Sequence, residues 1–183
     1  MIRITGGEFR GRKIKSPPGS SSRPTLDTVR EALFNIIGNR LDGIRLLDLY
    51  AGVGLVGIEA LSRGAKEVVF VEREISLVKV LRENLALLGI KERGKIFHGS
   101  ALSLVLRLAK KSFDVIFLDP PYHSDDAEII LTKLGFSESK PGELVIVQHS
   151  HKERFRDSVG QLRQLRQERY GETMLSFYQP LNS

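Results

Sequence analysis

The stretch "LLDLYAGVGLVGIEAL", residues 46–61, joins a short apolar run to a longer apolar segment through a glycine-rich turn. Gly52, Gly54 and Gly57 stand there in the spacing G-x-G-x-x-G, after a strand-like run and at the start of a helix-like one. Glycines at a strand-to-helix turn permit a tight turn and a close approach of the backbone to a ligand. The stretch therefore predicts the first unit of a nucleotide-binding α/β domain.

Strand-like and helix-like segments alternate through the rest of the chain. Apolar runs of strand length occupy 45–50, 68–72, 113–118 and 144–148, with weaker candidates at 95–98, 162–170 and 173–179. Helical patterns occupy 26–40, 55–63, 75–88, 101–111, 125–134 and 152–160. Strands that alternate with helices at this spacing form a parallel sheet covered on both faces. The last two strand candidates flank Gly171-Glu172, a hairpin signal that adds an antiparallel edge.

Length and composition describe an ordinary globular chain. Its 183 residues suit one domain with a sizeable core. The chain has no cysteine, which excludes disulfides and cysteine-based zinc sites or nucleophiles. No apolar signal core opens the sequence, and no run approaches the ~18 apolar residues of a membrane span. We expect a cytoplasmic protein with no membrane partner.

Positive charge gathers at the N-terminus. Residues 1–40 hold eight Lys/Arg and three Asp/Glu, so +5 of the net charge of +6 lies there. The first fifteen residues predict a β-hairpin joined through Gly6-Gly7, with a loop at 16–25 behind it. We expect residues 1–25 to form a basic hairpin and loop beside a domain over 26–183. Such a patch suits a polyanion, although charge alone equally fits a solvated surface. The candidates for contacts to phosphates are Arg10, Arg12 and Lys13.

Acids end the first two predicted strands. Glu72 is placed to accept both hydroxyls of a ribose, which suits NAD and S-adenosylmethionine equally. Asp48, four residues before Gly52, separates the two, because an acid there repels a pyrophosphate and attracts a cationic amino or sulfonium group. The pattern therefore favours S-adenosylmethionine, with a helix-capping acid as the other interpretation of Asp48. The adenine is expected beside Ser100 and Ala101, after the next strand candidate.

The strand at 113–118 runs into "DPPY", residues 119–122. Proline cannot donate to a strand ladder, so the strand ends there. An amino group on a base needs two acceptors for its hydrogens, and the Asp119 carboxylate and the Pro120 carbonyl can supply them. Tyr122 offers a ring face on which the base can stack. The turn predicts methyl transfer to an amino group through positioning and a proton acceptor, with a plain strand-ending turn as the alternative.

Several segments together resemble the RsmD-type methyltransferases of bacterial small-subunit ribosomal RNA, which modify a guanine 2-amino group. The similar segments are "GGEFRGRKI", "RPTLDTVREALFNII", "DLYAGVGLVGIEALSRGA", "DPPY" and "GETMLSFY". The resemblance covers most of the chain, and the second segment is the most specific, because generic amino-methyltransferases lack it. Thr28 and Ser100 depart from the family pattern, which commonly has a basic residue and an acid at these positions.

This resemblance implies a class I methyltransferase fold, with a seven-stranded, mostly parallel sheet whose last strand is antiparallel. It implies S-adenosyl-L-methionine as cofactor, no metal, and ribosomal RNA as partner, alone or in an assembling small subunit. We expect a monomer. The resemblance also implies that Arg23 and Thr25 close over the active site.

Three other functions remain open. A DNA adenine-N6 methyltransferase uses the same turn but usually carries a target-recognition insertion, for which 183 residues leave little room. A protein-glutamine methyltransferase typically has Asn at the position of Asp119. A non-catalytic RNA-binding module explains the basic hairpin, but it does not explain Asp48, Glu72 and the D-P-P-Y turn together.

Overall fold

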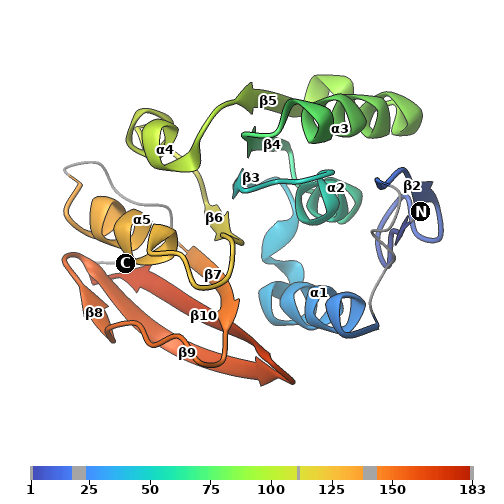
Figure 1. The fold of residues 1–183 in the computed structure, drawn as a ribbon. Coiled ribbons are helices and arrows are strands. Elements are labelled where there is room, and N and C mark those ends of the chain that lie inside the picture. Colours follow the sequence, from blue (N-terminus) through green and yellow to red (C-terminus); the bar gives the residue numbers. More distant parts are fainter. Residues whose placement is uncertain (1, 18–23, 111, 138–143, 182–183) are drawn as a thin grey trace.

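A single large sheet organises the structure, a computed structural model that describes residues 2–17, 24–110, 112–137 and 144–181. Its strand order is β5-β4-β3-β6-β7-β10-β9-β8 (Figure 1). Each neighbouring pair among β5, β4, β3, β6 and β7 is parallel. Strand β10 runs antiparallel to both β7 and β9. The strand bounds are β3 Arg45–Leu49, β4 Glu67–Glu72, β5 Gly94–His98, β6 Val115–Leu118, β7 Leu144–Ser150, β8 Ser158–Val159, β9 Leu162–Tyr170 and β10 Thr173–Pro180.

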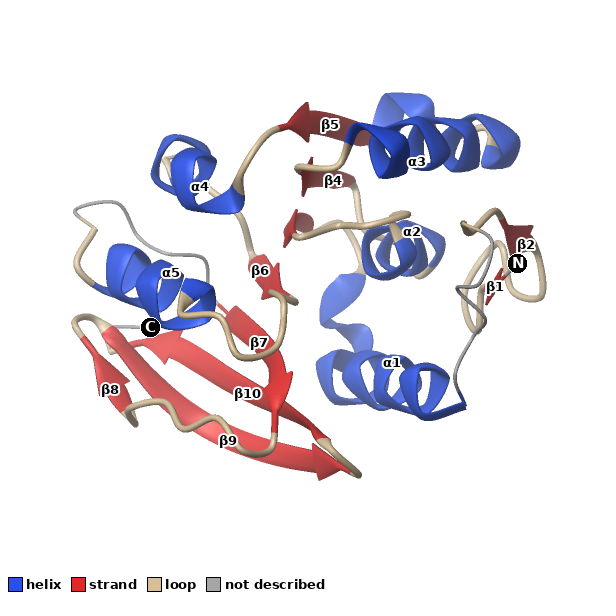
Figure 2. Ribbon diagram, viewed as in Figure 1, coloured by secondary structure: helices blue, strands red, loops and turns tan. Residues whose placement is uncertain are grey.

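Helices cover both faces of this sheet (Figures 1 and 2). One face carries α1, α2 and α3 with the cluster around Phe34, Ile58 and Leu81, and the other carries α4 and α5 with Val105 and Ile130. The helices are α1 Pro24–Ile37, α2 Leu55–Ser62, α3 Ile75–Leu88, α4 Ala101–Ala109 and α5 Asp126–Gly135, with 3-10 turns η1 Gly38–Leu41 and η2 Lys91–Arg93. None of the helices in the described ranges is long and apolar enough to cross a membrane.

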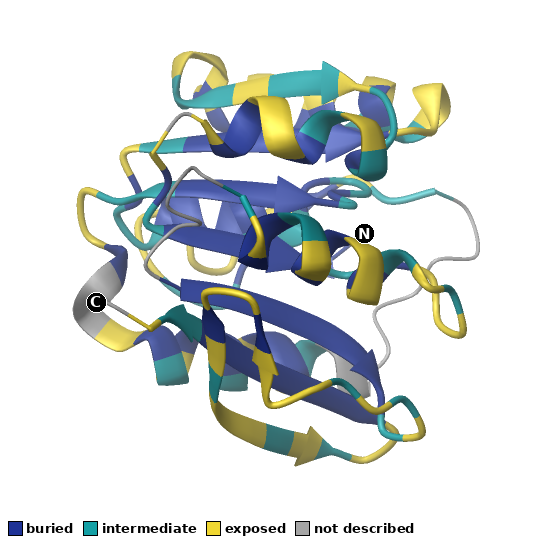
Figure 3. Cartoon of the chain, turned by 90° about the vertical axis from the view of Figure 1, so that its left-hand side faces the viewer, coloured by how far each residue is buried: buried dark blue, intermediate teal, exposed yellow. Residues whose placement is uncertain are grey.

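The central strands are buried along almost their whole length. In Figure 3 the middle of the sheet is buried, whereas β9 near its edge alternates between exposed and intermediate residues. Strands covered on both faces read as continuous apolar runs, which is why the sequence located them. The predicted seven-stranded, mostly parallel sheet with an antiparallel last strand is confirmed, and the two-residue β8 extends its edge.

The predicted helix over 152–160 is wrong. The chain there makes turns and then enters β8, which pairs with the start of β9. Only Phe155 and Val159 are apolar in this segment, too few for a helical stripe, and the Glu153 carboxylate is engaged by the backbone N–H of Ser150 at 2.7 Å. Gly160 lies close to Gly135 of α5, where an added Cβ would meet a carbonyl oxygen at 2.1 Å.

The N-terminal hairpin exists, but its form differs from the expectation. Its strands β1, Ile2–Arg3, and β2, Lys13–Ile14, are antiparallel, and residues 4–12 separate them instead of a tight turn at Gly6-Gly7. The unit also contributes to the core, because Ile4, Phe9 and Ile14 are buried against the α1–α3 side of the sheet. The hairpin is therefore part of the folded body.

Glu59 of α2 joins the hairpin to the helices. Its carboxylate accepts hydrogen bonds from Thr5 N at 2.9 Å, Thr5 Oγ1 at 2.7 Å and Gly6 N at 2.7 Å. It also pairs with Arg63 Nε at 2.9 Å, and Arg30 Nε lies 3.6 Å away. Glu59 is fully buried, so its negative charge depends on these partners for compensation. We call this cluster the Glu59 junction.

Replacing Glu59 with alanine is expected to destabilise the fold by about 3–5 kcal/mol, because two cationic side chains and two backbone N–H groups lose a buried partner. Denaturant unfolding measures the change. The matched control is Glu83→Ala, which breaks a pair with Lys15 whose side chains are both more than half exposed and should cost less than about 1 kcal/mol. Equal losses in the two variants would contradict the role of the Glu59 junction.

Candidate active site

A pocket of about 460 Å³ opens at the carboxyl ends of β3, β4, β5 and β6. This edge is where open parallel sheets bind their ligands. Of the predicted site residues, the pocket brings together Gly52, Glu72, Ser100, Ala101, Asp119, Pro120 and Tyr122. Its lining also includes Tyr50, Val71, Arg73, Glu74, Leu77, Gly99, Pro121 and Asp126. The pocket therefore joins the glycine turn to the D-P-P-Y turn.

Asp48 lies beneath this pocket. It is 1% exposed, and its Oδ2 accepts a hydrogen bond from Gly57 N at 3.0 Å, in the first turn of α2. The helix-capping role considered from the sequence is thus present. The other oxygen, Oδ1, is buried with no hydrogen-bond partner among the described residues. The pKa of Asp48 is raised to about 8, chiefly by burial and to a smaller extent by the nearby acids Asp119 and Glu72, while the hydrogen bond from Gly57 N–H acts in the opposite direction.

Glu72 is held by the backbone on both sides. Its Oε2 accepts from Gly52 N and its Oε1 from Glu74 N, each at 2.7 Å. The two bonds fix the carboxylate at the pocket wall, and each oxygen retains a second lone pair for a ligand. Ser100 and Ala101 stand opposite it at the start of α4, which begins directly after β5 and Gly99.

The three glycines have different roles. Gly52 lines the pocket with φ 57°, a conformation that favours glycine. Gly57 packs against β4, where an added Cβ would meet the Phe70 ring at 2.2 Å. Gly54 and Gly57 do not line the pocket. Gly54 lets the loop pack closely against α3, and Gly57 lets α2 pack closely against the sheet.

Asp119 is partly exposed in the pocket and is held from the neighbouring strand β7. Gln148 Nε2 donates to Asp119 Oδ1 at 3.0 Å. Burial raises the pKa of Asp119 to about 7, and the Gln148 hydrogen bond lowers it. The sequence prediction missed Gln148, although it ends the apolar run at 144–148, and a polar residue at a strand's carboxyl end was the signal that identified Asp48 and Glu72.

Tyr122 presents its ring to solvent at the pocket. The residue is 43% exposed, and its hydroxyl lies 3.1 Å from Thr173 Oγ1 at the start of β10. The next residue, His123, has φ 63° and donates its backbone N–H to Glu153 Oε1 at 3.0 Å. The D-P-P-Y turn is therefore braced by the C-terminal part of the chain and leaves an aromatic face open.

Tyr50 and Asp126 bridge the two halves of the pocket and were also missed. The Tyr50 hydroxyl donates to Asp126 Oδ2 at 2.8 Å. Burial and the Asp126 carboxylate raise the pKa of Tyr50 well above its usual value. Tyr50 has φ 71°, which is uncommon for a residue with a side chain. The contact links residues 76 apart in sequence, so no local pattern could have indicated it.

Three of the predicted substrate-contact residues, Arg10, Arg12 and Lys13, are not part of the pocket lining. Arg10 and Lys13 are exposed on the hairpin. Arg12 instead donates to Leu87 O at 2.8 Å, and its guanidinium lies 5.6 Å from the Phe9 ring centre. Arg23 falls outside the described residues, and Thr25 is placed only as backbone in the first turn of α1.

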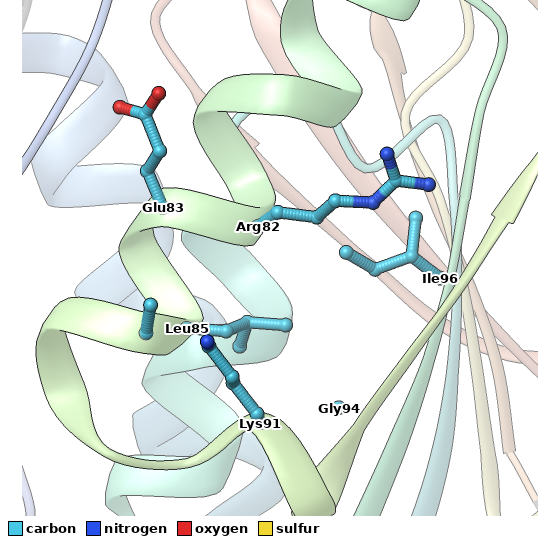
Figure 4. A pocket seen from close by; sticks show the side chains of 7 residues that line it. Arg82, Glu83, Leu85, Lys91, Gly94 and Ile96 are labelled. Atoms are coloured by element: carbon cyan, nitrogen blue, oxygen red, sulfur yellow. The ribbon is translucent and has the colours of Figure 1, made fainter.

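A second pocket, of about 530 Å³, lies between α3 and β5 (Figure 4). Arg82, Leu85, Lys91 and Ile96 line it together with Gly94, the first residue of β5. It therefore lies near the amino end of that strand, away from the edge where the acids meet. Within the described ranges, no cluster of His, Asp or Glu side chains could hold a metal ion.

Comparison with known proteins matches nearly the whole chain. The family described as "Conserved hypothetical protein 95" matches residues 2–179. The Bacillus subtilis protein YlbH is 35% identical over 180 residues, which is 97% of this chain and 98% of YlbH. "Ribosomal RNA small subunit methyltransferase D" of Haemophilus influenzae is 37% identical over 150 residues, which is 80% of this chain and 78% of that protein.

Solved structures agree with this match. The methyltransferase-related protein yhhF of Escherichia coli superposes with a TM-score of 0.83 at 30% identity, covering 98% of this chain and 97% of that one. A Thermus protein superposes at 0.79 with 30% identity, over 97% and 98% of the two chains. The chain belongs to the family described as "Conserved hypothetical protein 95", and its resemblance to the RsmD-type ribosomal RNA methyltransferases is confirmed.

Proposed function

We propose that this protein transfers a methyl group from S-adenosylmethionine to the 2-amino group of a guanine in small-subunit ribosomal RNA. The observation that carries the proposal is the pocket at the sheet's carboxyl edge. There the D-P-P-Y turn, with an acid and an open aromatic face, adjoins the glycine turn and the Glu72 carboxylate. The name of the Haemophilus relative, a small-subunit ribosomal RNA methyltransferase, supports the substrate class.

The residues present fit a cationic methyl donor. Asp48 Oδ1 is buried without a partner among the described residues, and a positive charge above it would offset this uncompensated burial. Glu72 can accept the ribose hydroxyls, and Ser100 and Ala101 would flank the adenine. S-adenosylmethionine, when bound, supplies an electrophilic methyl group on a positively charged sulfur.

The D-P-P-Y turn fits an amino group as methyl acceptor. Asp119 and the Pro120 carbonyl provide two acceptors for the two amino hydrogens, which orients the nitrogen lone pair. Tyr122 provides the stacking face. Asp119, with its pKa raised to about 7, is also suited to take the proton that the nitrogen releases. We further propose that Arg23 and Thr25 close over the bound base and that the partner is RNA, free or in an assembling small subunit.

The test of this proposal is to identify the methylated product. Purified protein incubated with labelled S-adenosylmethionine and small-subunit ribosomal RNA or particles should yield N2-methylguanosine after digestion to nucleosides. Asp119→Ala should abolish transfer while leaving donor binding intact, and Tyr122→Ala should weaken substrate binding by roughly 1–3 kcal/mol. Label in adenine or in protein glutamine, or full activity in Asp119→Ala, would contradict the proposal.

Loss of the Glu72 carboxylate should weaken donor binding. Glu72→Ala removes the acceptor of two ribose hydroxyls, so the dissociation constant measured by calorimetry should rise by about tenfold or more. Glu74→Ala is the matched control, because it removes an exposed acid from the same pocket wall and should change affinity little. Equal affinities in the parent and Glu72→Ala would exclude this donor site.

The basic hairpin is expected to bind RNA phosphates. Because Arg12 also contacts Leu87, the clean variant is Arg10→Ala with Lys13→Ala, which removes two exposed charges. The slope of log K against log salt should flatten by roughly 0.7–0.9 for each lost phosphate contact, with the melting temperature unchanged. The control removes Lys66 and Lys110, two exposed cations near the amino ends of β4 and β6. If the hairpin variant and the control variant had the same salt slope, the hairpin would not be the RNA-binding surface. The next residues to test would then be Lys152, Arg154 and Arg156.

A further inference from the structure

The end of β7 reaches into the proposed catalytic turn. Gln148 is 8% exposed, and its side-chain amide approaches Asp119 from the neighbouring parallel strand, with Nε2 3.0 Å from Oδ1. An ionised carboxylate carries no hydrogen, so only the NH2 end of the amide can satisfy it. Gln148 thus occupies one of the two Asp119 oxygens whenever Asp119 is charged.

We propose that Gln148 is a positioning residue that fixes the Asp119 carboxylate, so that Oδ2 is left to accept the amino group of the target base. This inference rests on the proposed function. A carboxylate on a single side-chain torsion can otherwise turn about its own axis and present either oxygen. Holding Oδ1 through a charge-assisted hydrogen bond selects one orientation and keeps the acceptor ready before the base arrives.

Among the residues that contact the D-P-P-Y turn, Gln148 is the one placed to orient the Asp119 carboxylate. Thr173 holds the Tyr122 hydroxyl, and Glu153 holds the backbone N–H of His123. These two contacts brace the turn on either side, but neither reaches the carboxylate. Of the hydrogen bonds in the described part of the chain, the one from Gln148 is the contact made to the Asp119 carboxylate.

Gln148 also opposes the effect of burial on the pKa of Asp119. Asp48 faces it from β3, while the pocket wall adds Glu72 and Glu74 from the β4 side, with Arg73 between them, and Asp126 from α5. Most of these neighbours are acids, and burial favours the protonated form of Asp119. The Gln148 hydrogen bond is the influence that lowers the pKa of Asp119 toward the ionised form. Removing the Gln148 hydrogen bond should raise the pKa of Asp119, so the Asp119 carboxylate would stay protonated up to a higher pH.

The test uses the full chain with ribosomal RNA, and it measures kcat and KM between about pH 5.5 and 9.5. Activity requires ionised Asp119, so the parent rate rises with pH through the Asp119 pKa. In Gln148→Leu this rise should move to higher pH by about one unit or more, because the variant loses a hydrogen bond that stabilises the charged carboxylate. Gln148→Glu, which keeps the shape but adds a like charge, should shift it further. KM for S-adenosylmethionine should be unchanged in Gln148→Leu.

Thr173→Val is the matched control, because it frees Tyr122 without touching Asp119. It should raise KM for RNA and leave the position of the pH rise unchanged. A uniform loss of kcat in Gln148→Leu and Gln148→Glu, with the parental pH profile, would overturn the positioning role. Absence of methyl transfer to guanine by the parent protein would instead contradict the proposed function, so the two failures are distinguishable.

Discussion

Burial of acids at one edge of the sheet is the constraint on which the rest of the structure depends. Parallel pairing of β3 and β6 brings Asp48, in β3, close to Asp119, directly after β6; Asp48 is buried, whereas Asp119 is partly covered and lines the pocket. Burial alone opposes their ionisation, and each acid has one hydrogen bond that partly offsets it, from Gly57 and from Gln148. A cationic ligand beside these acids would offset the remaining cost of ionising them. The same buried acids therefore shape the electrostatics of the fold and suit the proposed methyl donor.

Two supports hold this edge in place from opposite ends of the chain. On one side the Glu59 junction ties the hairpin to α1 and α2, and α2 begins at the glycine turn. On the other side Thr173 and the loop after β7 brace the D-P-P-Y turn. The turn after β3 and the start of α5 meet through the hydrogen bond from Tyr50 to Asp126. The pocket is therefore assembled from segments distant in sequence, each anchored to a buried element.

The sequence predicted the parallel sheet because strands buried on both faces are continuous apolar runs bounded by turn residues. It indicated Asp48, Glu72 and Asp119 as candidate site residues because ligands bind where such strands end. It failed at 152–160, where Phe155 and Val159 are the only apolar residues and are too few to mark one face of a helix. It could not give the partners: Gln148 meets Asp119 across 29 positions, and Tyr50 meets Asp126 across 76. Such pairs depend on how strands and loops pack, which no local periodicity records.

We propose that Asp48, whose pKa is raised to about 8 in the free protein, is largely protonated at pH 7 and becomes ionised when a cationic methyl donor binds. Calorimetric titration of S-adenosylmethionine at pH 7, in buffers with different ionisation enthalpies, tests it directly. Because the pKa of Asp48 is raised to about 8 in the free protein, binding should release protons, and the release should be smaller in Asp48→Asn, in which Asp119 remains as the other acid with a raised pKa. A binding enthalpy that is independent of the buffer, or proton release that persists unchanged in Asp48→Asn, would contradict the account.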